Sequence, residues 1–212
     1  MAPPNIMSQQ HSKHSTAKCL TRFKGDDLFN KEIALKKRGQ CVPIVAETSR
    51  MKVDKLKIIV FDLDYTLWPF WIDTHVSPPF KKHNGGVVDT YGAAVKYYSE
   101  VPEVLKILTE LGYEIGIASR TSEIRAANQL LDLFNWNKYI KYKQIFPGCK
   151  VTHFSNIKEQ SKREYDEMLF FDDESRNIRD LNKVGVVSIL VKNGVTMHAV
   201  EQGIKNYAKQ RT

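Results

Sequence analysis

From residue 56 onward, short apolar runs alternate with amphipathic segments along the chain. Five runs predict buried strands because they are short, apolar and rich in β-branched residues; they span 57–61, 113–119, 139–146, 167–172 and 186–191. Four segments with apolar residues at helical spacing predict helices at 101–112, 121–134, 175–185 and 196–210. Such alternation predicts an α/β fold, a doubly wound parallel sheet with helices on both faces.

Local signals mark the ends of these helices and a hairpin between the first strand and the first helix. Pro102 stands near the start of one helix, Gly112 and Gly185 follow helix ends, and Thr121 or Ser122 is the expected N-cap of another. In the irregular stretch from Trp68 to about Tyr98, Asn84-Gly85 is a hairpin turn signal. We expect a small flap there.

Composition supports a globular domain preceded by a basic extension. The chain has 212 residues, of which 42% are hydrophobic, so it can bury a core. No apolar run approaches the roughly 20 residues that cross a bilayer, and we expect no membrane partner. Residues 1–52 hold ten Lys and Arg against four Asp and Glu, whereas residues 53–212 hold 22 against 20. The net charge of +8 therefore belongs mainly to the extension, which argues against a nucleic-acid-binding fold.

The extension, residues 1–52, has no motif of its own. Basic residues precede any acid in 1–24, which suggests a mitochondrial targeting segment, but scarce arginine and poor amphipathicity favour a disordered tail or an alternative translation start. A short helix is expected at 26–38. Cys19, Cys41 and Cys149 are too few and scattered for a disulfide framework or a zinc site. We therefore expect a cytoplasmic protein with a working domain at 53–212.

An acid pair directly follows the first predicted strand. Asp62 and Asp64 are two residues apart, so they project to the same side of an extended segment. Carboxylates this close repel each other unless a cation neutralises them or one carries a proton. Taken alone, the pair favours the simpler interpretation of an acidic cap leading into a turn.

Three further features also follow predicted strands. Ser119 and Arg120 precede a helix, where a hydroxyl and backbone N–H groups form an anion site, although simple N-capping is the alternative. Lys150 is suited to neutralise a phosphoryl oxygen, whereas a single lysine is usually a solvated surface residue. Asp172 and Asp173 precede a predicted helix, where acidic residues commonly offset the helix dipole. The alternative is that they form a Mg²⁺ site together with Asp62 and Asp64. The joint pattern favours chemistry at the carboxyl edge of the sheet.

These four features resemble the motifs of the haloacid dehalogenase-like superfamily of phosphohydrolases. More closely, FDLDYTLWPFWIDTH, EVPEVL, ASRTSEI, FPGCKVTHF and FFDDESRNI are similar to the eukaryotic magnesium-dependent phosphatase 1 family, over residues 57–207. The resemblance implies a Rossmann-like core without a large cap domain. It also implies a Mg²⁺-dependent phosphatase that acts through an aspartyl-phosphate.

The resemblance also implies residue roles. Asp62 is the expected nucleophile and Asp64 the expected acid and base. Mg²⁺ is expected at Asp62, Asp173 and the backbone carbonyl of Asp64. The resemblance leaves two roles open for Asp172, which either orients Lys150 or a metal-bound water or is itself a direct metal ligand. Ser119, Lys150 and the backbones of Leu63 and Arg120 are expected to bind the phosphoryl oxygens. Each of these residues lies at a motif position.

Substrate recognition is less determined by the sequence. Trp68, Phe70 and Trp71 more often indicate core packing than ligand contact, but Trp71 follows the nucleophile loop and we place it at the mouth of the pocket. The expected substrates are phosphotyrosine or sugar-phosphate groups, on a phosphoprotein or a small molecule, and the expected state is a monomer. The alternatives are a small-metabolite phosphatase of the same fold and a non-catalytic basic binding module, although the latter is disfavoured because both acids are present.

Overall fold

The computed structural model describes residues 51–211. The targeting segment considered at 1–24 and the short helix expected at 26–38 lie outside the described residues. Met51 and Lys52 were expected to belong to the extension, but both contact the domain. The Tyr113 hydroxyl donates a hydrogen bond to the Met51 carbonyl at 2.6 Å and accepts one from the Val53 amide at 2.8 Å. Because Met51 is buried, the packed domain includes this residue.

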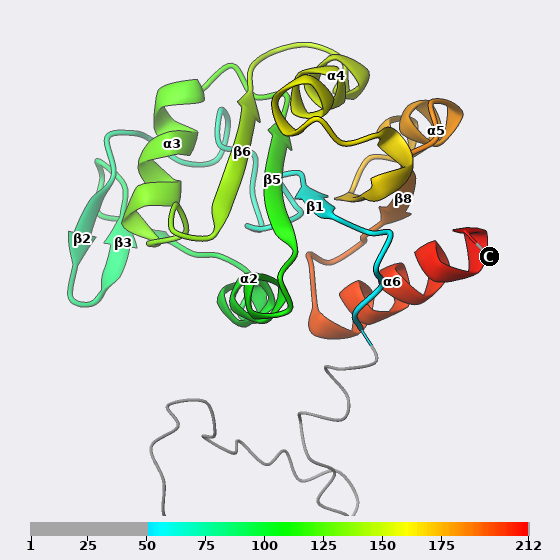
Figure 1. Ribbon diagram of the computed structural model, residues 1–212. Helices are drawn as coiled ribbons and strands as arrows, with labels where there is room; N and C mark the ends of the chain where they lie inside the picture. The colour runs from blue at the N-terminus through cyan, green and yellow to red at the C-terminus, as the bar shows by residue number, and fades with distance from the viewer. Residues whose placement is uncertain (1–50, 212) are drawn as a thin grey trace, which may run out of the picture.

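A five-stranded parallel sheet forms the centre of the molecule (Figure 1). Its strands run in the order β6-β5-β1-β7-β8. Their bounds are Ile58–Phe61 for β1, Glu114–Ser119 for β5, Ile140–Ile145 for β6, Met168–Asp172 for β7 and Val187–Leu190 for β8. Since β1 pairs with both β5 and β7, the loop after β1 opens between the loops after its two neighbours. All five predicted strands are confirmed, with ends shifted by at most one residue.

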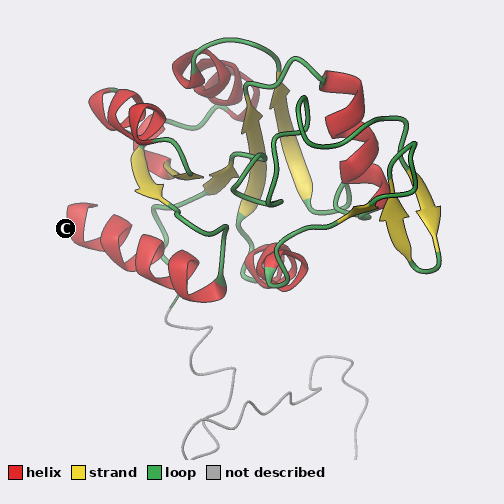
Figure 2. Cartoon of the chain, turned by 180° about the vertical axis from the view of Figure 1, so that it is seen from behind, coloured by secondary structure: helices red, strands yellow, loops and turns green. Residues whose placement is uncertain are grey.

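Helices cover both faces of the sheet, as the front and back views show (Figures 1 and 2). One core lies under α2 (Val101–Glu110), α3 (Ile124–Leu133) and α6 (Met197–Arg211). The opposite core lies under α4 (Lys150–Ser161) and α5 (Ser175–Lys183). A 3-10 turn, η1 (Tyr165–Glu167), leads into β7. Among the helices of residues 51–211, none is long and apolar enough to span a membrane.

Strand β1 shows why a continuous apolar run forms the centre of such a sheet. Ile59 and Phe61 belong to the core on the α2 side, and Ile58 and Val60 belong to the core on the α4 side. All four side chains are fully buried, because successive residues of a strand point to opposite faces and both faces are covered. The first polar residue after this run, Asp62, therefore marks where the chain leaves the sheet.

The irregular stretch after β1 contains a small antiparallel sheet of β2 (Lys81–His83), β3 (Gly86–Val88) and β4 (Ala94–Val95). The predicted hairpin turn is confirmed, because Asn84 and Gly85 both have positive φ, 46° and 79°, between paired strands. The side chain of Gln129 on α3 accepts from the Phe80 amide at 2.9 Å and donates to the Phe80 carbonyl at 3.0 Å. The hairpin thus lies against α3. Of the stretch from Trp68 to about Tyr98, which was expected to form a flap beside the site, only the turn at residues 71–74 lines the cleft.

One helix was not predicted, and one expected helix cap was wrong. Helix α4 was not predicted, because its twelve residues include few apolar positions. Its buried side is completed by Lys150 and His153, which a hydrophobic pattern does not count. The N-cap of α3 is Glu123, not Thr121 or Ser122. The Thr121 hydroxyl instead accepts from the Glu123 amide at 3.1 Å, which orders the loop between Ser119 and the helix.

Candidate active site

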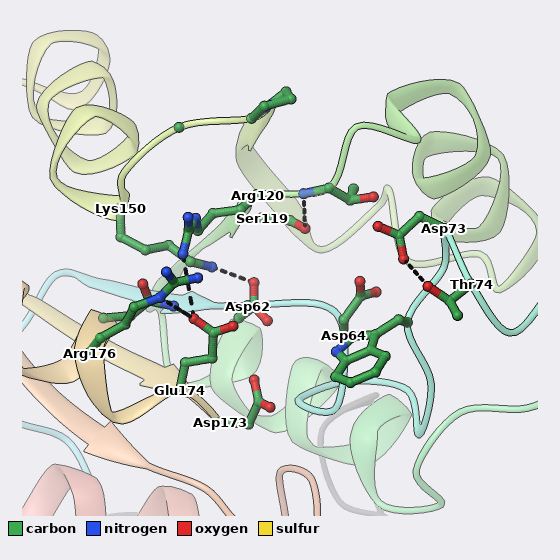
Figure 3. Close-up of a pocket in the computed structure, with 15 residues that line it drawn as sticks. Asp62, Asp64, Asp73, Thr74, Ser119, Arg120, Lys150, Asp173, Glu174 and Arg176 are labelled. Carbon is green, nitrogen blue, oxygen red and sulfur yellow. Dashed lines mark hydrogen bonds and ion pairs between the residues drawn. The ribbon is translucent and has the colours of Figure 1, made fainter.

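A cleft of about 430 Å³ opens at the carboxyl edge of the parallel sheet (Figure 3). The loops after β1, β5 and β7 and the start of α4 form its walls. In parallel sheets, ligands bind at this edge. The lining side chains are mostly polar or charged: Asp62, Asp64, Trp71, Asp73, Thr74, Ser119, Arg120, Thr121, Pro147, Gly148, Lys150, Asp173, Glu174, Arg176 and Asn177.

The floor of the cleft is a buried charge cluster around Lys150. The Lys150 ammonium donates to Asp62 Oδ1 and to the Ala118 carbonyl, and it forms an ion pair with Asp172 Oδ2 at 3.1 Å. Helix α4 carries the lysine from its first turn into the sheet edge, where only 2% of the residue is exposed. This overturns the alternative of a solvated surface lysine. A buried ammonium needs such partners, and here it has two carboxylates.

Burial and charge act in opposite directions on these groups. Burial raises the pKa of Asp62 to about 8, and the Asp172 charge adds to this rise, while Lys150 partly offsets both. Burial by itself would lower the pKa of the Lys150 ammonium, but the charges of Asp62 and Asp172 outweigh it and raise that pKa. The lysine therefore stays charged, and the carboxylates around it outnumber the cations. A further cation at this point would favour ionised Asp62.

Asp64 is held at the cleft wall by hydrogen bonds from the turn that follows it. The Trp68 indole N–H donates to Asp64 Oδ1 at 2.6 Å, and the Ile72 amide donates to Oδ2 at 3.4 Å. Burial raises the pKa of Asp64 to about 6, although the Trp68 hydrogen bond opposes the rise. A carboxyl group with this pKa can both give and take a proton near neutrality, as an acid–base catalyst must.

Asp172 and Asp173, the late acid pair, differ in their hydrogen bonding. In the described part of the chain, neighbouring residues donate to the Asp172 carboxylate and not to the Asp173 carboxylate. Asp172 is fully buried, and it accepts from the Glu174 amide at 2.7 Å and from the Asn177 side chain at 3.0 and 3.1 Å. Within residues 51–211, no other residue donates a hydrogen bond to the Asp173 carboxylate, and burial together with the Asp172 charge raises its pKa to about 6. Asp173 is therefore the member of the pair with oxygens available to a ligand.

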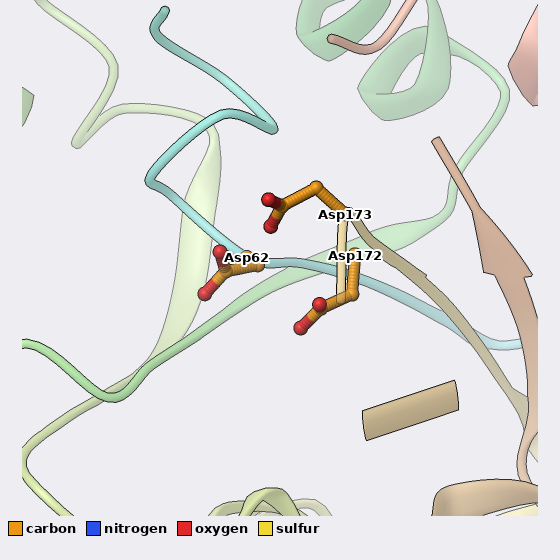
Figure 4. Close-up of side chains that lie close together, drawn as sticks. All are labelled: Asp62, Asp172 and Asp173. Atoms are coloured by element: carbon orange, nitrogen blue, oxygen red, sulfur yellow. The ribbon is translucent and has the colours of Figure 1, made fainter. Parts of the chain in front are cut away.

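Asp62, Asp172 and Asp173 form a candidate cation site. One carboxylate oxygen from each lies within 4.8 Å of the others, and the three side chains converge at the end of the sheet (Figure 4). Hard divalent cations such as Mg²⁺ prefer a few carboxylates completed by waters. The donor set fits Mg²⁺, because it supplies only oxygen atoms and carries more negative charge than Lys150 balances.

A buried histidine connects the loops that carry Ser119 and Lys150. His153 Nε2 lies 3.0 Å from the Ser119 carbonyl and 2.9 Å from the Phe146 carbonyl, and Nδ1 lies 2.8 Å from the Cys149 carbonyl. Its ring stacks on Phe146 with a centroid distance of 4.0 Å. The histidine thereby connects the end of β5, the end of β6 and the start of α4. These contacts hold the segment that carries Ser119 in place relative to the helix that carries Lys150.

The rim facing this cluster carries an exposed aromatic side chain. Trp68 and Phe70 stack on each other in the core, whereas Trp71 is 50% exposed and lines the cleft. Trp71 stacks on His75 with a centroid distance of 5.4 Å, and its amide donates to His75 Nδ1 at 3.0 Å. The core interpretation is thus right for Trp68 and Phe70, and Trp71 lies at the mouth as expected.

The cleft brings together most of the residues singled out by the sequence. Asp62, Asp64, Trp71, Ser119, Arg120, Lys150 and Asp173 all line it. Leu63 and Asp172 are fully buried beneath it. Among the other lining residues, five were not predicted as site residues: Asp73, Thr74, Glu174, Arg176 and Asn177. Of these, Asn177 had a usable signal, because an amide in the first turn of a helix after an acid pair can reach back to those acids.

Comparisons with known proteins agree with this geometry. The sequence profile described as Acid Phosphatase matches residues 54–210. The human protein called Magnesium-dependent phosphatase 1 is 51% identical over 157 residues, which cover 74% of this chain and 89% of that protein. A HAD-like hydrolase superfamily protein of Schizosaccharomyces pombe is 42% identical, over 61% of this chain and 82% of that protein. A haloacid dehalogenase-like family hydrolase from Streptococcus pneumoniae has a similar fold, with a TM-score of 0.52 at 10% identity over 73% of this chain and 92% of that chain.

Proposed function

This chain belongs to the Acid Phosphatase family and is a magnesium-dependent phosphatase of the haloacid dehalogenase-like superfamily, and we propose that it hydrolyses phosphomonoesters through an aspartyl-phosphate on Asp62. The observation that carries the proposal is the contact of Asp62 with a buried Lys150, beside the hydrogen-bonded Asp64. This arrangement offers a nucleophile, a cation for the phosphoryl group and a proton donor within one cleft.

The phosphoryl group is bound by donors from three loops. The Lys150 ammonium supplies a positive charge next to the nucleophile. Ser119 Oγ lies 3.5 Å from the Thr121 amide, from which it accepts, so its hydroxyl proton is free to donate to a phosphoryl oxygen. The backbone N–H groups of Leu63 and Arg120 add further donors in this proposal. Donors placed in advance stabilise the charge that develops on the phosphoryl oxygens.

Catalysis proceeds in two displacements. In the first, an Asp62 carboxylate oxygen forms a bond to phosphorus as the bond to the leaving oxygen breaks, and Asp64 gives its proton to that oxygen. In the second, Asp64 takes a proton from a water molecule whose oxygen bonds to phosphorus. The bond between Asp62 and phosphorus then breaks, which releases phosphate and restores the carboxylate.

Asp62, Asp173 and the backbone carbonyl of Asp64 are the proposed magnesium ligands. When bound there, Mg²⁺ screens the repulsion between the Asp62 carboxylate and the phosphoryl group. Asp172 does not supply a ligand in this proposal, because Lys150, Asn177 and the Glu174 amide already occupy its oxygens. It positions Lys150 instead.

The open cleft suits a substrate larger than its phosphoryl group. No large cap covers the site in residues 51–211, and the small β2-β3-β4 sheet lies against α3. Trp71 offers a half-exposed aromatic ring at the rim, suited to contact with an aromatic or sugar ring. We therefore propose phosphotyrosine or sugar-phosphate groups, on a protein or a small molecule, as substrates.

A panel of phosphomonoesters tests the proposal, assayed with Mg²⁺ and with a chelator. We expect Mg²⁺-dependent phosphate release by the full chain and none by the Asp62→Asn variant, which lacks the anionic oxygen. Acid quenching with a ³²P-labelled aryl phosphate should place the label on Asp62 in the wild type. Label on Asp64, or on the Asp62→Asn protein, would contradict the assigned roles.

A further inference from the structure

One side of the cleft rim carries two arginines that share a single carboxylate. Arg176 Nε lies 2.7 Å and Arg120 Nη1 lies 3.5 Å from the same oxygen, Glu174 Oε2. The Asn177 amide also reaches this oxygen, at 3.3 Å. In Figure 3 both guanidinium groups turn toward Glu174, across the cleft from Asp73 and Thr74. We call Arg120 and Arg176 the arginine pair.

The arginine pair has donors and charge beyond what Glu174 satisfies. Two guanidinium groups face the single Glu174 carboxylate, which can balance only one of their two charges. Arg176 uses only its Nε toward Glu174, and among residues 51–211 the buried Nε of Arg120 has no hydrogen-bond partner. A buried N–H group without an acceptor is costly, so an acceptor supplied by a ligand would be bound favourably.

A purely structural role explains the arrangement poorly. The side chains of Arg120, Glu174 and Arg176 are 34%, 44% and 56% exposed. Ion pairs this exposed contribute little to stability, and one arginine is enough to neutralise Glu174. The second arginine therefore calls for a different explanation.

The arginine pair lines the same cleft as the Asp62 carboxylate. Arg120 follows β5 and Glu174 follows β7, and these strands flank β1 in the sheet. The Arg120–Glu174 contact thus crosses the strand end that carries Asp62. The phosphoryl charge itself already meets Lys150 on the floor of the cleft. The arginines remain available to whatever extends outward from the phosphoryl group.

We propose that Arg120 and Arg176 bind a second anionic group, a carboxylate or a phosphate, on the leaving-group side of the substrate. The planar guanidinium fork matches both anions in bidentate geometry. Glu174 holds the arginine pair in place and competes with the substrate anion for it. This inference rests on the proposed phosphatase function and narrows its substrates to phosphomonoesters with a second negative charge.

A matched pair of substrates tests the proposal in the full chain with Mg²⁺. The pair is 3-carboxyphenyl phosphate and 3-carbamoylphenyl phosphate, which differ by one negative charge at nearly equal size. We expect the wild type to show a KM about fivefold lower for the carboxylate, with kcat values within about twofold. Arg176→Gln should remove this preference and leave the carbamoyl substrate unchanged. Arg179→Gln, an equal charge loss at an exposed residue of α5 outside the cleft, should behave as the wild type.

A second variant shifts the preference in the opposite direction. Glu174→Gln removes the competing carboxylate, so the KM for the carboxylate substrate should fall about threefold further while the carbamoyl substrate is unaffected. Equal KM values for both substrates in the wild type would overturn the subsite and leave the phosphatase function standing. An equal loss on both substrates in Arg176→Gln would also overturn it, since the arginine would then serve the phosphoryl group. If the wild type hydrolyses neither substrate nor any other phosphomonoester, the proposed function fails, and this inference fails with it.

Discussion

Replacing Asp64 with asparagine separates the two displacements of the proposed mechanism. The Asp62 nucleophile remains, but the proton donor of the first step and the base of the second are lost. Each role is worth about 10²–10⁴-fold in rate. An aryl phosphate leaves without protonation, so Asp64→Asn should still form the aspartyl-phosphate from it. An alkyl phosphate needs the proton, and its turnover should fall by the full factor.

The pKa of Asp64 sets the size of the pH effect in the wild type. Burial raises that pKa to about 6, so the group is roughly 90% protonated at pH 5 and roughly 10% at pH 7. Because the protonated form is the active acid, alkyl phosphate turnover should fall about tenfold per pH unit above 6 where leaving-group departure limits the rate. Asp64→Asn should lack this decline, since the amide does not titrate.

Two assays check this prediction. The first is a pH profile of kcat for an alkyl and an aryl phosphate in both proteins. The second is acid-quench trapping with labelled aryl phosphate, followed by mass analysis of the peptide spanning Lys57 to Lys81. Labelled Asp62 should accumulate in Asp64→Asn, because the hydrolysis of the intermediate is slowed. Equal losses on both substrate types, with no trapped label, would refute the acid–base role of Asp64.

Three further predictions concern the extension, the metal and the late acid pair. A chain that starts at Met51 should keep the full chain's kcat. A chain that starts at Leu56 should lose about 3 kcal/mol of unfolding free energy, because it lacks the buried methionine and leaves the Tyr113 hydroxyl unpaired. Chemical denaturation measures this loss, and equal midpoints for the two chains would contradict it. Ca²⁺ should inhibit in place of Mg²⁺, since with more ligands at longer distances it can engage both oxygens of Asp62; equal turnover with either ion would argue against this. Asn177→Ala should raise the Mg²⁺ concentration for half-maximal activity about tenfold by freeing Asp172, next to the metal ligands; a titration that matches the wild type would count against this role.

Much of the fold could be predicted from the sequence, because local patterns carry it. Strand β1 is an unbroken apolar run whose side chains are buried on both faces of the sheet. Helix α2 has a proline at its start and apolar residues at helical spacing. The hairpin at Asn84-Gly85 follows from the backbone conformation those residues adopt readily. Helix α4 lacked such a pattern, since tertiary contacts bury its Lys150 and His153. Periodicity records only side chains that are buried because they are apolar.

The sequence by itself also indicated which residue types stand at the strand ends, and hence the class of chemistry. The tertiary structure decided how they meet. The order β5-β1-β7 brings Ser119 and Asp172 to either side of Asp62, although they lie far apart along the chain. The tertiary structure also places hydrogen-bond donors around the Asp172 carboxylate and leaves the Asp173 carboxylate available to a ligand. The sequence cannot reveal this difference, because the two residues are adjacent and identical. Contacts between distant segments depend on how the elements pack, and that information lies in the assembled core rather than in any local pattern.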